Sequence, residues 1–439
     1  MKQLKAILIG AGGRGKLYTD IMGAYPDKFK VVGVAEPLKE RREYVQNKHN
    51  IDAAYCKESW EELLSLPKFA DVAAICSMDR LHCAHAVAAL KQGYDLLLEK
   101  PVAATAQDCA IILKTAKEYG RKVLVCHTMR YHPFWRTLKA LLKEDKIGQI
   151  MSVEHIEAVG QLLYTHAFVR GNFNNSETSS FMLLQKCSHD LDMLGWLMDE
   201  DCKRIHSFGG LTHFRRENAP EGSPERCIDG CPVSDTCVHN AMKIYYDDKR
   251  NHWVRADAAK VPSGTETDAD VLNAMHTSEY GKCIYKCNNN VVDHQTVNME
   301  FESGATVTLN MSAFAKQTVL GSRRIRIMGT KGDLIGDLGL EVDKAFSFYD
   351  FKTCRREVLD VSKYIEKYSF ETPIPCHFGD TGVILDLYDY LVGNISGEGL
   401  SEIEASVKNH MLAFAAEDSR LEGKVIDLKE YLDNYLNKQ

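Results

Sequence analysis

The sequence predicts an α/β protein whose N-terminal third folds as a doubly wound parallel sheet. Two observations predict this class. An apolar run, a glycine-rich turn and a helical segment open the chain over residues 4–25. Strand-like and helix-like segments then alternate up to about residue 128, which is the pattern of a parallel sheet whose strands are joined by helices.

The opening segment has the spacing of a dinucleotide-binding turn. Gly10, Gly12 and Gly15 stand in G-x-G-x-x-G register, and Glu36 ends the next strand-like segment, 21 residues after Gly15. Gly10 permits the tight turn, Gly12 lets the backbone approach a pyrophosphate, and Gly15 lets the helix pack on the strand. The N-terminus of the helix offers free N–H groups to the phosphates. Together these features indicate a Rossmann domain that binds a dinucleotide.

The acidic residue after the second strand favours NAD over NADP. A carboxylate at Glu36 accepts hydrogen bonds from the ribose hydroxyls and repels a 2′-phosphate. Arg41 and Arg42 could soften this preference, although a solvated helix face is the simpler interpretation of them. Ligands of such sheets lie at the carboxyl ends of the strands. The expected cofactor-binding residues are Gly10, Gly12, Gly13, Arg14, Gly15, Glu36, Ser77, Met78, His82, Glu99, Lys100 and Arg130.

The composition is that of an ordinary soluble globular chain and argues against several classes of function. The 439 residues are 45% hydrophobic and 26% charged, and the length suits two domains. A net charge of −7 gives no basic stripe for nucleic acid. The N-terminal apolar run is too short for a signal peptide, and no stretch reaches the roughly 18 apolar residues of a membrane span. We therefore expect a cytoplasmic protein without nucleic-acid or membrane partners.

The segment Glu99-Lys100-Pro101, which ends a strand after SMDRLHCAHAVAALKQG, carries a family resemblance. In this context the sequence resembles the Gfo/Idh/MocA family of NAD(P)-dependent oxidoreductases. The resemblance covers about the first 135 residues and resumes at residues 186–198 and 404–428. Its motifs are specific for the family but do not identify a substrate.

The resemblance implies how the rest of the chain is organised. It implies a Rossmann domain over residues 1–128, then an α/β domain over residues 129–439 for substrate binding and oligomerisation. The second domain would contain a large mixed, mostly antiparallel sheet, and segments 149–160, 294–314 and 323–338 have the β-branched, near-alternating composition of its strands. The family also implies a homo-oligomer, a dimer or a tetramer, packed through open sheet faces.

Lys100 and His189 are the predicted catalytic residues. Oxidising a secondary alcohol with NAD requires hydride departure and a base that takes the hydroxyl proton. A lysine can be that base if burial and the positive nicotinamide ring lower its pKa. The resemblance implies that His189 shares the substrate hydroxyl with Lys100. Asp192 lies on the same helical face and could either orient the imidazole or anchor the two domains to each other.

One position departs from the family pattern. Many members carry an aspartate four residues before this histidine, where the present chain has Gln185, which cannot act as a base. Either Lys100 and His189 suffice, or the neighbouring Lys186 contacts an anionic or oxygen-rich substrate. Other hydrogen-bonding groups lie in a loop-like stretch at residues 160–177 and before an amphipathic helix near residue 378. The predicted substrate-binding residues are Tyr164, His166, Arg170, Lys186 and His377. Loop side chains satisfied within the protein are the competing interpretation.

Five of the 14 cysteines fall in two short, turn-rich segments. These five are Cys227, Cys231, Cys237, Cys283 and Cys287. Thiolates so spaced can converge on one tetrahedral ion, and zinc prefers four sulfurs. Structural zinc, an iron–sulfur cluster, and free or disulfide-bonded cysteines are the alternatives. The region around residues 220–290 has the character of an insertion into the second domain, and a metal would hold it together.

The leading functional hypothesis is an NAD-dependent oxidoreductase that acts on a ring hydroxyl of a sugar, a sugar derivative or a cyclitol. The first alternative is an NAD-dependent glycoside hydrolase, in which transient oxidation at C3 allows elimination at C1. It needs a second base, for which Tyr164, His166 or His377 could serve. The second alternative is a non-catalytic NAD-binding regulator, against which the presence of both Lys100 and His189 argues.

Overall fold

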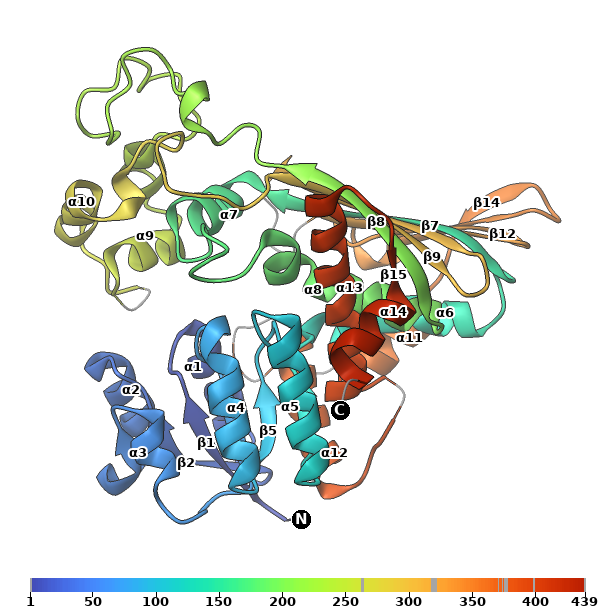
Figure 1. The fold of residues 1–439 in the computed structure, drawn as a ribbon, viewed down its shortest axis with the longest axis horizontal. Coiled ribbons are helices and arrows are strands. Elements are labelled where there is room, and N and C mark those ends of the chain that lie inside the picture. Colours follow the sequence, from blue (N-terminus) through green and yellow to red (C-terminus); the bar gives the residue numbers. More distant parts are fainter. Residues whose placement is uncertain are drawn as a thin grey trace.

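The computed structural model of the chain describes residues 2–261, 264–316, 322–369, 371–372, 374, 378–397 and 399–437. Figure 1 shows two sheets, one in the N-terminal part of the chain and a larger one in the remainder, with helices between them. Within the described residues, no helix is both long enough and apolar enough to cross a membrane.

The N-terminal sheet has six strands, all paired in parallel, in the order β3-β2-β1-β4-β5-β6. Its strands are β1 (Leu4–Ile9), β2 (Phe29–Ala35), β3 (Cys56–Lys57), β4 (Val72–Ile75), β5 (Asp95–Leu98) and β6 (Val123–Val125). Its helices are α1 (Gly13–Ala24), α2 (Lys39–His49), α3 (Trp60–Leu64), α4 (His82–Lys91) and α5 (Ala106–Glu118). This strand order is that of a dinucleotide-binding doubly wound sheet, which confirms the predicted class.

Both faces of this sheet are buried, which explains why its strands are nearly continuous apolar runs. Ile7 and Ile9 of β1 belong to one core cluster, whereas Leu8 of the same strand belongs to the other. The second cluster also includes Val383 and Leu387 from α12 (Phe378–Val392). A late segment of the chain therefore returns to cover one face of the N-terminal sheet.

The glycine turn between β1 and α1 is as tight as its sequence predicts. Gly10 has a φ of +93°, which favours glycine. A Cβ at Gly15 would lie 2.1 Å from the Gly10 carbonyl oxygen, so the helix packs there only because the side chain is missing. Helix α1 begins at Gly13, with Gly12 at its N-cap and no side chain capping it. Its first N–H groups are thus left without a capping side chain.

The larger sheet has nine strands in the order β14-β13-β12-β11-β7-β10-β9-β8-β15. These strands are β7 (Ile150–Gly160), β8 (Cys202–Gly210), β9 (His294–Phe301), β10 (Thr306–Ala315), β11 (Ser322–Gly329), β12 (Gly332–Asp337), β13 (Phe346–Asp350), β14 (Arg355–Val358) and β15 (Ile426–Asp427). Strands β7 and β10 pair in parallel and every other pair is antiparallel. This confirms the expected mixed, mostly antiparallel sheet.

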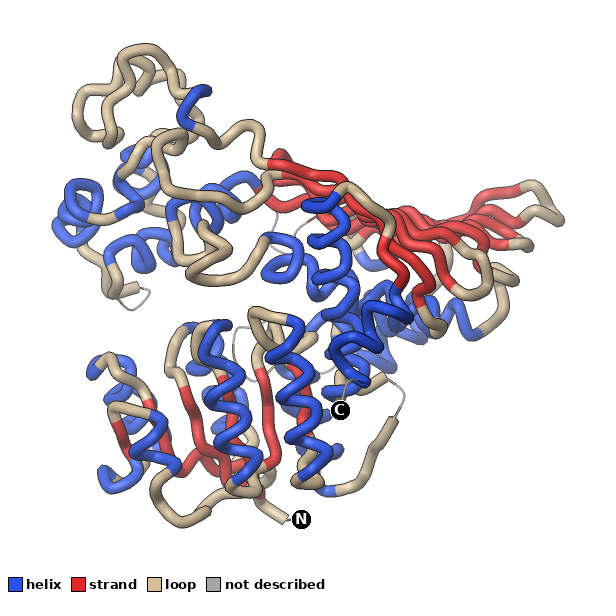
Figure 2. Tube along the Cα trace, in the orientation of Figure 1, coloured by secondary structure: helices blue, strands red, loops and turns tan. Residues whose placement is uncertain are grey.

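Helices lie between the large sheet and the N-terminal domain (Figure 2). These helices are α6 (Pro133–Lys143), α8 (Met182–Met198), α11 (Ser362–Tyr368), α13 (Ile403–Glu422) and α14 (Leu428–Leu432). Helix α8 packs against α13 and contacts β7 and β10, and α13 also contacts α5 of the N-terminal domain. Helix α8 is therefore held at the boundary between the two sheets.

The chain between β8 and β9, residues 211–293, forms a unit with its own small core. It contains α9 (His252–Ala259) and α10 (Asp268–Thr277), at the upper left of Figure 1. Tyr245, Val254 and Met275 are the centre of this core. We call residues 211–293 the insertion.

Short helical turns complete the chain. The 3-10 turns are η1 (Ala53–Tyr55), η2 (Asp79–Leu81), η3 (Thr128–Tyr131), η5 (Arg216–Asn218), η7 (Glu279–Gly281) and η8 (Val342–Lys344). The remaining turns are α7 (Gln161–Tyr164) and the π-helical turns η4 (Thr165–Arg170), η6 (Met242–Asp247) and η9 (Asp433–Asn437).

Candidate active site

Lys100 connects the N-terminal domain to helix α8. It lies two residues after the end of β5, at the carboxyl edge of the parallel sheet. Its Nζ atom donates hydrogen bonds to the backbone oxygen of Gln185, at 2.7 Å, and to Oε1 of the same residue, at 2.9 Å. His189 follows Gln185 by one helical turn and so lies on the same face of α8. The two predicted catalytic residues are thus brought to one place from the two parts of the chain.

Gln185 also links the lysine to a carboxylate. Its Nε2 atom donates to Oδ2 of Asp79 at 2.8 Å, and the same oxygen accepts hydrogen bonds from Ser179 and Ser180. Gln185 stands where the family pattern has an aspartate. Its side-chain amide therefore accepts a hydrogen bond from Lys100 and donates one to the carboxylate of Asp79. The sequence does not indicate Asp79 as a site residue, because only its contact with Gln185 brings it to Lys100.

The surroundings of Lys100 make its amine easier to deprotonate. Burial lowers the pKa of the amine, and the nearby cations Lys186 and Arg14 lower it further. The carboxylates Glu99 and Asp79 act in the opposite direction but do not cancel the effect. A lysine with a lowered pKa loses its proton closer to neutral pH, as a general base requires.

His189 is neutral and has a free ring nitrogen. Burial holds its pKa well below the usual range, and the positive charge of Lys100 acts in the same direction. The Nδ1 atom is buried and has no hydrogen-bond partner among the described residues. The ring of His127 lies 5.8 Å away, between centroids. The residue as a whole is only half-buried, so His189 can present an uncharged imidazole to a bound molecule.

A buried network of charges connects α8 to strands β7 and β11 of the large sheet. Arg323 donates through Nε to Asp190 and lies 2.8 Å from both Asp190 Oδ1 and Glu157 Oε2. His155 Nε2 lies 2.8 Å from the same Asp190 oxygen. Burial alone would raise the pKa of Asp190, but Arg323 and His155 outweigh it and hold that pKa far below its usual value. This network fixes the helix that carries His189.

Lys186 belongs to this network. Its Nζ atom lies 3.2 Å from Oε1 of Glu157, a carboxylate that is fully buried. The ammonium group therefore has a protein counter-ion, and the predicted contact of Lys186 with a substrate stays a prediction.

Asp192 anchors α8 to its neighbours. It accepts two hydrogen bonds from Arg130, at 2.6 and 2.8 Å, and a third from Asn409 on α13 at 3.0 Å. Of the two roles considered for Asp192, these contacts favour the anchor. The guanidinium group of Arg130, a predicted cofactor residue, faces Asp192 and the Leu400 carbonyl oxygen, which satisfy a buried cation, and its role toward a cofactor stays a prediction.

Glu36 lies against the glycine turn. Its Oε2 atom accepts a hydrogen bond from the Ala11 N–H at 2.7 Å, and its Oε1 atom accepts from Leu38 at 3.0 Å. The carboxylate thus sits beside Gly10 and Gly12, where an acid that recognises ribose hydroxyls belongs.

The other predicted cofactor residues mostly have protein partners. Arg14 is paired with Glu99 at 2.9 Å and with Asp380 at 2.7 Å. The two ring nitrogens of His82 lie close to the carbonyl oxygens of Pro101 and Ser77. Met78 is 42% exposed beside them, and the roles of all these residues toward a cofactor stay predictions.

The structure corrects the sequence interpretation of three predicted substrate-binding residues, Tyr164, His166 and Arg170. The stretch expected as a loop forms α7 and η4, and the three side chains are buried rather than open to a substrate. Tyr164 donates to the Val292 carbonyl oxygen at 3.0 Å, and His166 lies 3.0 Å from Asp257. The insertion covers all three, which is the physical reason for their burial. His377 lies outside the described residues.

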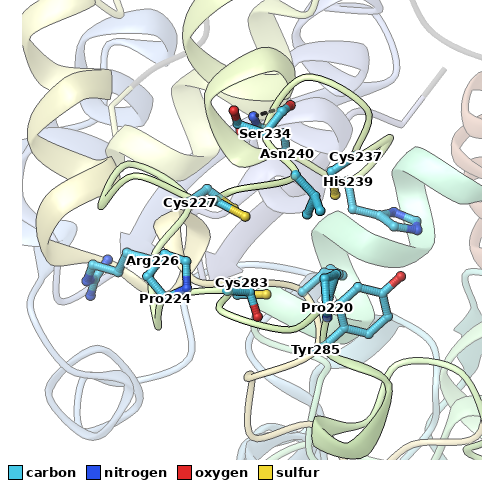
Figure 3. A pocket seen from close by; sticks show the side chains of 14 residues that line it. Pro220, Pro224, Arg226, Cys227, Ser234, Cys237, His239, Asn240, Cys283 and Tyr285 are labelled. Carbon is cyan, nitrogen blue, oxygen red and sulfur yellow. Dashed lines mark hydrogen bonds between the residues drawn. The ribbon is translucent and has the colours of Figure 1, made fainter.

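The cysteine cluster is only partly as predicted. Four of the five cysteines, Cys227, Cys231, Cys237 and Cys283, line one small cavity, but Cys287 does not (Figure 3). All five are free thiols, so no disulfide joins them. Across the described residues, no three His, Cys, Asp or Glu side chains are positioned to hold a single metal ion. The expected structural zinc ion is therefore not supported.

Two family models match the chain. The model described as "Oxidoreductase family, NAD-binding Rossmann fold" matches residues 4–127, and that described as "GFO/IDH/MocA C-terminal domain" matches residues 135–335. Together they cover more than half of the chain.

Curated relatives match over part of their length. YteT of Bacillus subtilis (strain 168), which is named as an oxidoreductase, is 23% identical over 64% of this chain and 66% of its own length. Inositol 2-dehydrogenase of Salmonella typhimurium (strain LT2) is 24% identical over 46% of this chain and 56% of its own length. The chain thus spans about two thirds or less of these relatives.

Solved structures share the fold over almost the whole chain. The WlbA dehydrogenase from Bordetella pertussis, solved with NADH and UDP-GlcNAcA, matches with a TM-score of 0.68 and 16% identity, covering 97% of this chain and 98% of that one. An oxidoreductase from Agrobacterium radiobacter, solved with NAD+, L-tartaric acid and magnesium, matches with a TM-score of 0.66 and 15% identity, covering 98% and 99%. Taken with the family models, the fold and the meeting of Lys100 with α8 lead to one conclusion: the chain belongs to the Gfo/Idh/MocA oxidoreductase family.

Proposed function

We propose that the protein is an NAD-dependent oxidoreductase that transfers a hydride between nicotinamide and a ring hydroxyl of a sugar, a sugar derivative or a cyclitol. The observation that carries the proposal is the pair of hydrogen bonds from Lys100 to Gln185, which brings an amine with a lowered pKa to the helix of His189. The names of relatives support the substrate class, since they include inositol 2-dehydrogenase and a dehydrogenase solved with a nucleotide sugar.

The residues of the glycine turn fit a dinucleotide. A Cβ placed on Gly12 would meet no neighbour closer than the Arg41 side chain at 3.9 Å, so the space beside this backbone is open. Helix α1 has no capping side chain, so its N-terminal N–H groups are available to a pyrophosphate. Glu36 is beside the turn to accept hydrogen bonds from a ribose. When bound, nicotinamide accepts or donates the hydride.

Gln185 orients Lys100 for proton transfer. A neutral lysine amine has two N–H bonds and one lone pair. The two oxygens of Gln185 accept hydrogen bonds from Nζ, so both N–H bonds have acceptors on α8. The lone pair then points away from Gln185 and is free to take the proton of a substrate hydroxyl. His189, neutral and only half-buried as a residue, can hold the same hydroxyl from the second side.

The glycoside hydrolase alternative has less support. It requires a second base, and two of the three candidates, Tyr164 and His166, are buried against the insertion. An aryl glycoside included in the assay below tests this alternative: release of the aryl group without NADH would favour it over the oxidoreductase.

A substrate screen tests the proposal. The purified protein is incubated with NAD+ and a panel of sugars, sugar acids and cyclitols, and NADH is followed by its absorbance. We expect NADH with at least one polyol, and a loss of about 10²–10⁴-fold in kcat/KM for Lys100→Ala, the range of general acid–base catalysis. NAD+ binding by this variant, measured by calorimetry, should be retained.

Lys117→Ala is the matched control. Its side chain is 60% exposed on α5 and pairs with the exposed Glu404, not with a residue of the site, so its loss should leave kcat/KM unchanged. Failure of the wild-type protein to bind NAD+, or full activity of Lys100→Ala, would overturn the proposal. Binding of NAD+ without oxidation of any polyol would instead favour the non-catalytic regulator.

A further inference from the structure

A buried histidine beside the candidate active site has no part in the proposed reaction. His127 lies two residues after β6, at the same carboxyl edge of the N-terminal sheet as Lys100. Its side chain is fully buried, yet neither ring nitrogen has a hydrogen-bond partner among the described residues. Buried polar groups are rarely left in this state. Both nitrogens of His127 are thus available to a neighbouring group.

The ring of His127 contacts two other imidazole rings. Its centroid is 5.8 Å from that of His189, with the two ring planes at 80° to each other. It is 5.2 Å from that of His410, at 61°. His189 belongs to α8 and His410 to α13, so three separate segments of the chain bring the rings together.

His410 cannot be the partner of His127, because the backbone uses both of its nitrogens. Its Nε2 atom accepts a hydrogen bond from the Val102 N–H at 3.0 Å. The proton of the neutral ring is therefore on Nδ1, which donates to the Ser406 carbonyl oxygen at 2.7 Å. This ring has neither a donor nor an acceptor left for His127.

A carboxylate places the proton of His127 on Nε2. This atom lies 3.8 Å from Oδ1 of Asp192, and a negative charge favours an N–H group over a lone pair on the nitrogen that faces it. The same oxygen already accepts hydrogen bonds from Arg130 and Asn409, and 3.8 Å is too long for a third. Burial lowers the pKa of His127 to about 4, so the ring carries a single proton near neutral pH. A buried N–H donor therefore faces α8 without an acceptor in the described part of the chain.

His189 offers the matching acceptor. Its Nδ1 atom is buried and has no hydrogen-bond partner among the residues that the structure describes. His189 lies three residues before Asp192 on α8, so both are on the helix face toward which Nε2 of His127 points. A small rotation of either ring brings the two nitrogens within hydrogen-bond reach. Hydrogen bonds of active sites are often long before substrate binds and tighten in the complex.

We propose that His127 is a positioning residue that fixes the tautomer of His189. The Nε2–H group of His127 donates to Nδ1 of His189, so the one proton of the His189 ring stays on Nε2. That nitrogen donates to the oxygen of the substrate hydroxyl, while Lys100 takes the hydroxyl proton. His189 then stabilises the negative charge that develops on the oxygen as the hydride leaves. This inference rests on the proposed oxidoreductase function.

NMR spectroscopy of the full chain tests the tautomer without any substrate. The histidines are labelled with the NMR-active nitrogen isotope, and the His189 signals are assigned by their loss in His189→Gln. In the wild-type chain, free and with NAD+, we expect a protonated Nε2 and an unprotonated Nδ1 at His189. His410, whose tautomer the backbone fixes, should show the opposite pattern and is the internal reference.

His127→Phe keeps an aromatic ring and removes the donor. The His189 proton should then no longer be confined to Nε2. For the polyol found in the substrate screen, kcat should fall by about 10²–10³-fold, the usual loss when one donor to a developing oxyanion is removed. KM should change little, because the donor acts mainly in the transition state. His127→Gln restores an amide N–H near the position of Nε2 and should recover part of kcat, which a residue that only fills space would not explain.

A His189 ring protonated at Nδ1 in the wild-type chain would overturn the proposal. So would an unchanged His189 tautomer, or full kcat, in His127→Phe. Thermal unfolding shows whether His127→Phe folds, and the wild-type spectrum together with His127→Gln decides the matter if it does not. Failure to oxidise any polyol would count against the proposed function, whereas the spectra would still report the tautomer, so the two failures are distinguishable.

Discussion

Lys100 and His189 could be predicted from the sequence, but the residues that tune them could not. The segment Glu99-Lys100-Pro101 and the family pattern around His189 indicate which two side chains meet. Asp79 becomes relevant only through Gln185, 106 residues further along the chain. Gln185, which was expected to remove a base from the site, instead accepts two hydrogen bonds from the lysine amine, one at its backbone oxygen and one at its side-chain Oε1 atom.

Asp79→Asn should shift the pH dependence of polyol oxidation. The Asp79 carboxylate raises the pKa of Lys100, so its removal should lower that pKa further. Because the base must be unprotonated, kcat/KM rises with pH through the Lys100 pKa, and this rise should move to lower pH in the variant. The measurement is a pH profile of kcat/KM with the substrate found in the screen.

The control for this profile is Ser180→Ala, which removes a hydrogen bond to Asp79 but keeps the charge. The pH profile of kcat/KM for Ser180→Ala should lie closer to the wild-type profile than to the Asp79→Asn profile. A rise that moves to higher pH in Asp79→Asn would show that the carboxylate does not act on Lys100 as described.

Two glycines of the nucleotide turn should respond differently to alanine. At Gly12 a Cβ would meet nothing closer than the Arg41 side chain at 3.9 Å, so Gly12→Ala should fold normally but hinder the approach of a pyrophosphate. NAD+ affinity should fall by about tenfold or more, which corresponds to ~1.4 kcal/mol. Gly15→Ala places its Cβ 2.1 Å from the Gly10 oxygen and should destabilise the fold itself, by about 1–3 kcal/mol.

Thermal unfolding and calorimetry on the same two variants separate these effects. An unchanged NAD+ affinity in a well-folded Gly12→Ala protein would argue that the dinucleotide does not approach this turn. A melting temperature for Gly15→Ala equal to that of the wild type would show that the close packing of helix on strand is not required.

At the scale of elements, helix α8 is the part that assembles the site. Gln185, His189 and Asp192 recur at spacings of four and three residues, so they share one face of the helix. Sequence periodicity predicts this helix and this face. It does not predict that Asp192 pairs with Arg130, because that partner lies 62 residues earlier in the chain, outside the helix.

Arg130→Ala should destabilise the protein strongly. It leaves the buried carboxylate of Asp192 without its cation, which typically costs about 3–5 kcal/mol of folding free energy. Lys117→Ala, which breaks an exposed pair with Glu404, should cost about 0–1 kcal/mol. Urea unfolding of both variants measures the difference, and similar losses in the two would contradict the anchoring role of the pair.

The pair of Arg130 and Asp192 also makes the folding stability depend on pH, in a direction that follows from the pKa of Asp192. Burial would raise the pKa of Asp192, but Arg130 and His127 outweigh it and lower that pKa below its usual value. The stabilisation is therefore present above the unfolded pKa of about 3.9 and is lost as the pH falls through the lower folded value. The stability gap between wild type and Arg130→Ala should accordingly be wider at neutral pH than in strong acid.

The turns α7 and η4 show where sequence reasoning fails at this scale. Their polar residues have the composition of a binding loop, and a short π-helical turn leaves no periodic pattern. The partners that bury His166 and Arg170 lie 57 to 112 residues away, in the insertion. Only the folded insertion shows that these side chains connect two parts of the chain.

At the scale of the whole molecule, the N-terminal sheet could be predicted almost completely and the remainder only in outline. Continuous apolar strands and glycine turns determine a parallel sheet locally. The large sheet pairs β7 with β10 and β11, more than 140 residues later, so its order is not visible in any local pattern. The return of α12 to the N-terminal core is a further long-range contact of this kind.

A crystal structure of the protein with NAD+ tests the central claim most directly. We expect the pyrophosphate at the N-terminus of α1 beside Gly12, the adenosine ribose at Glu36, and the nicotinamide facing Lys100 and His189. It would be contradicted by a dinucleotide bound elsewhere, or by a nicotinamide ring from which the Lys100 amine and the His189 imidazole cannot both reach one hydroxyl oxygen.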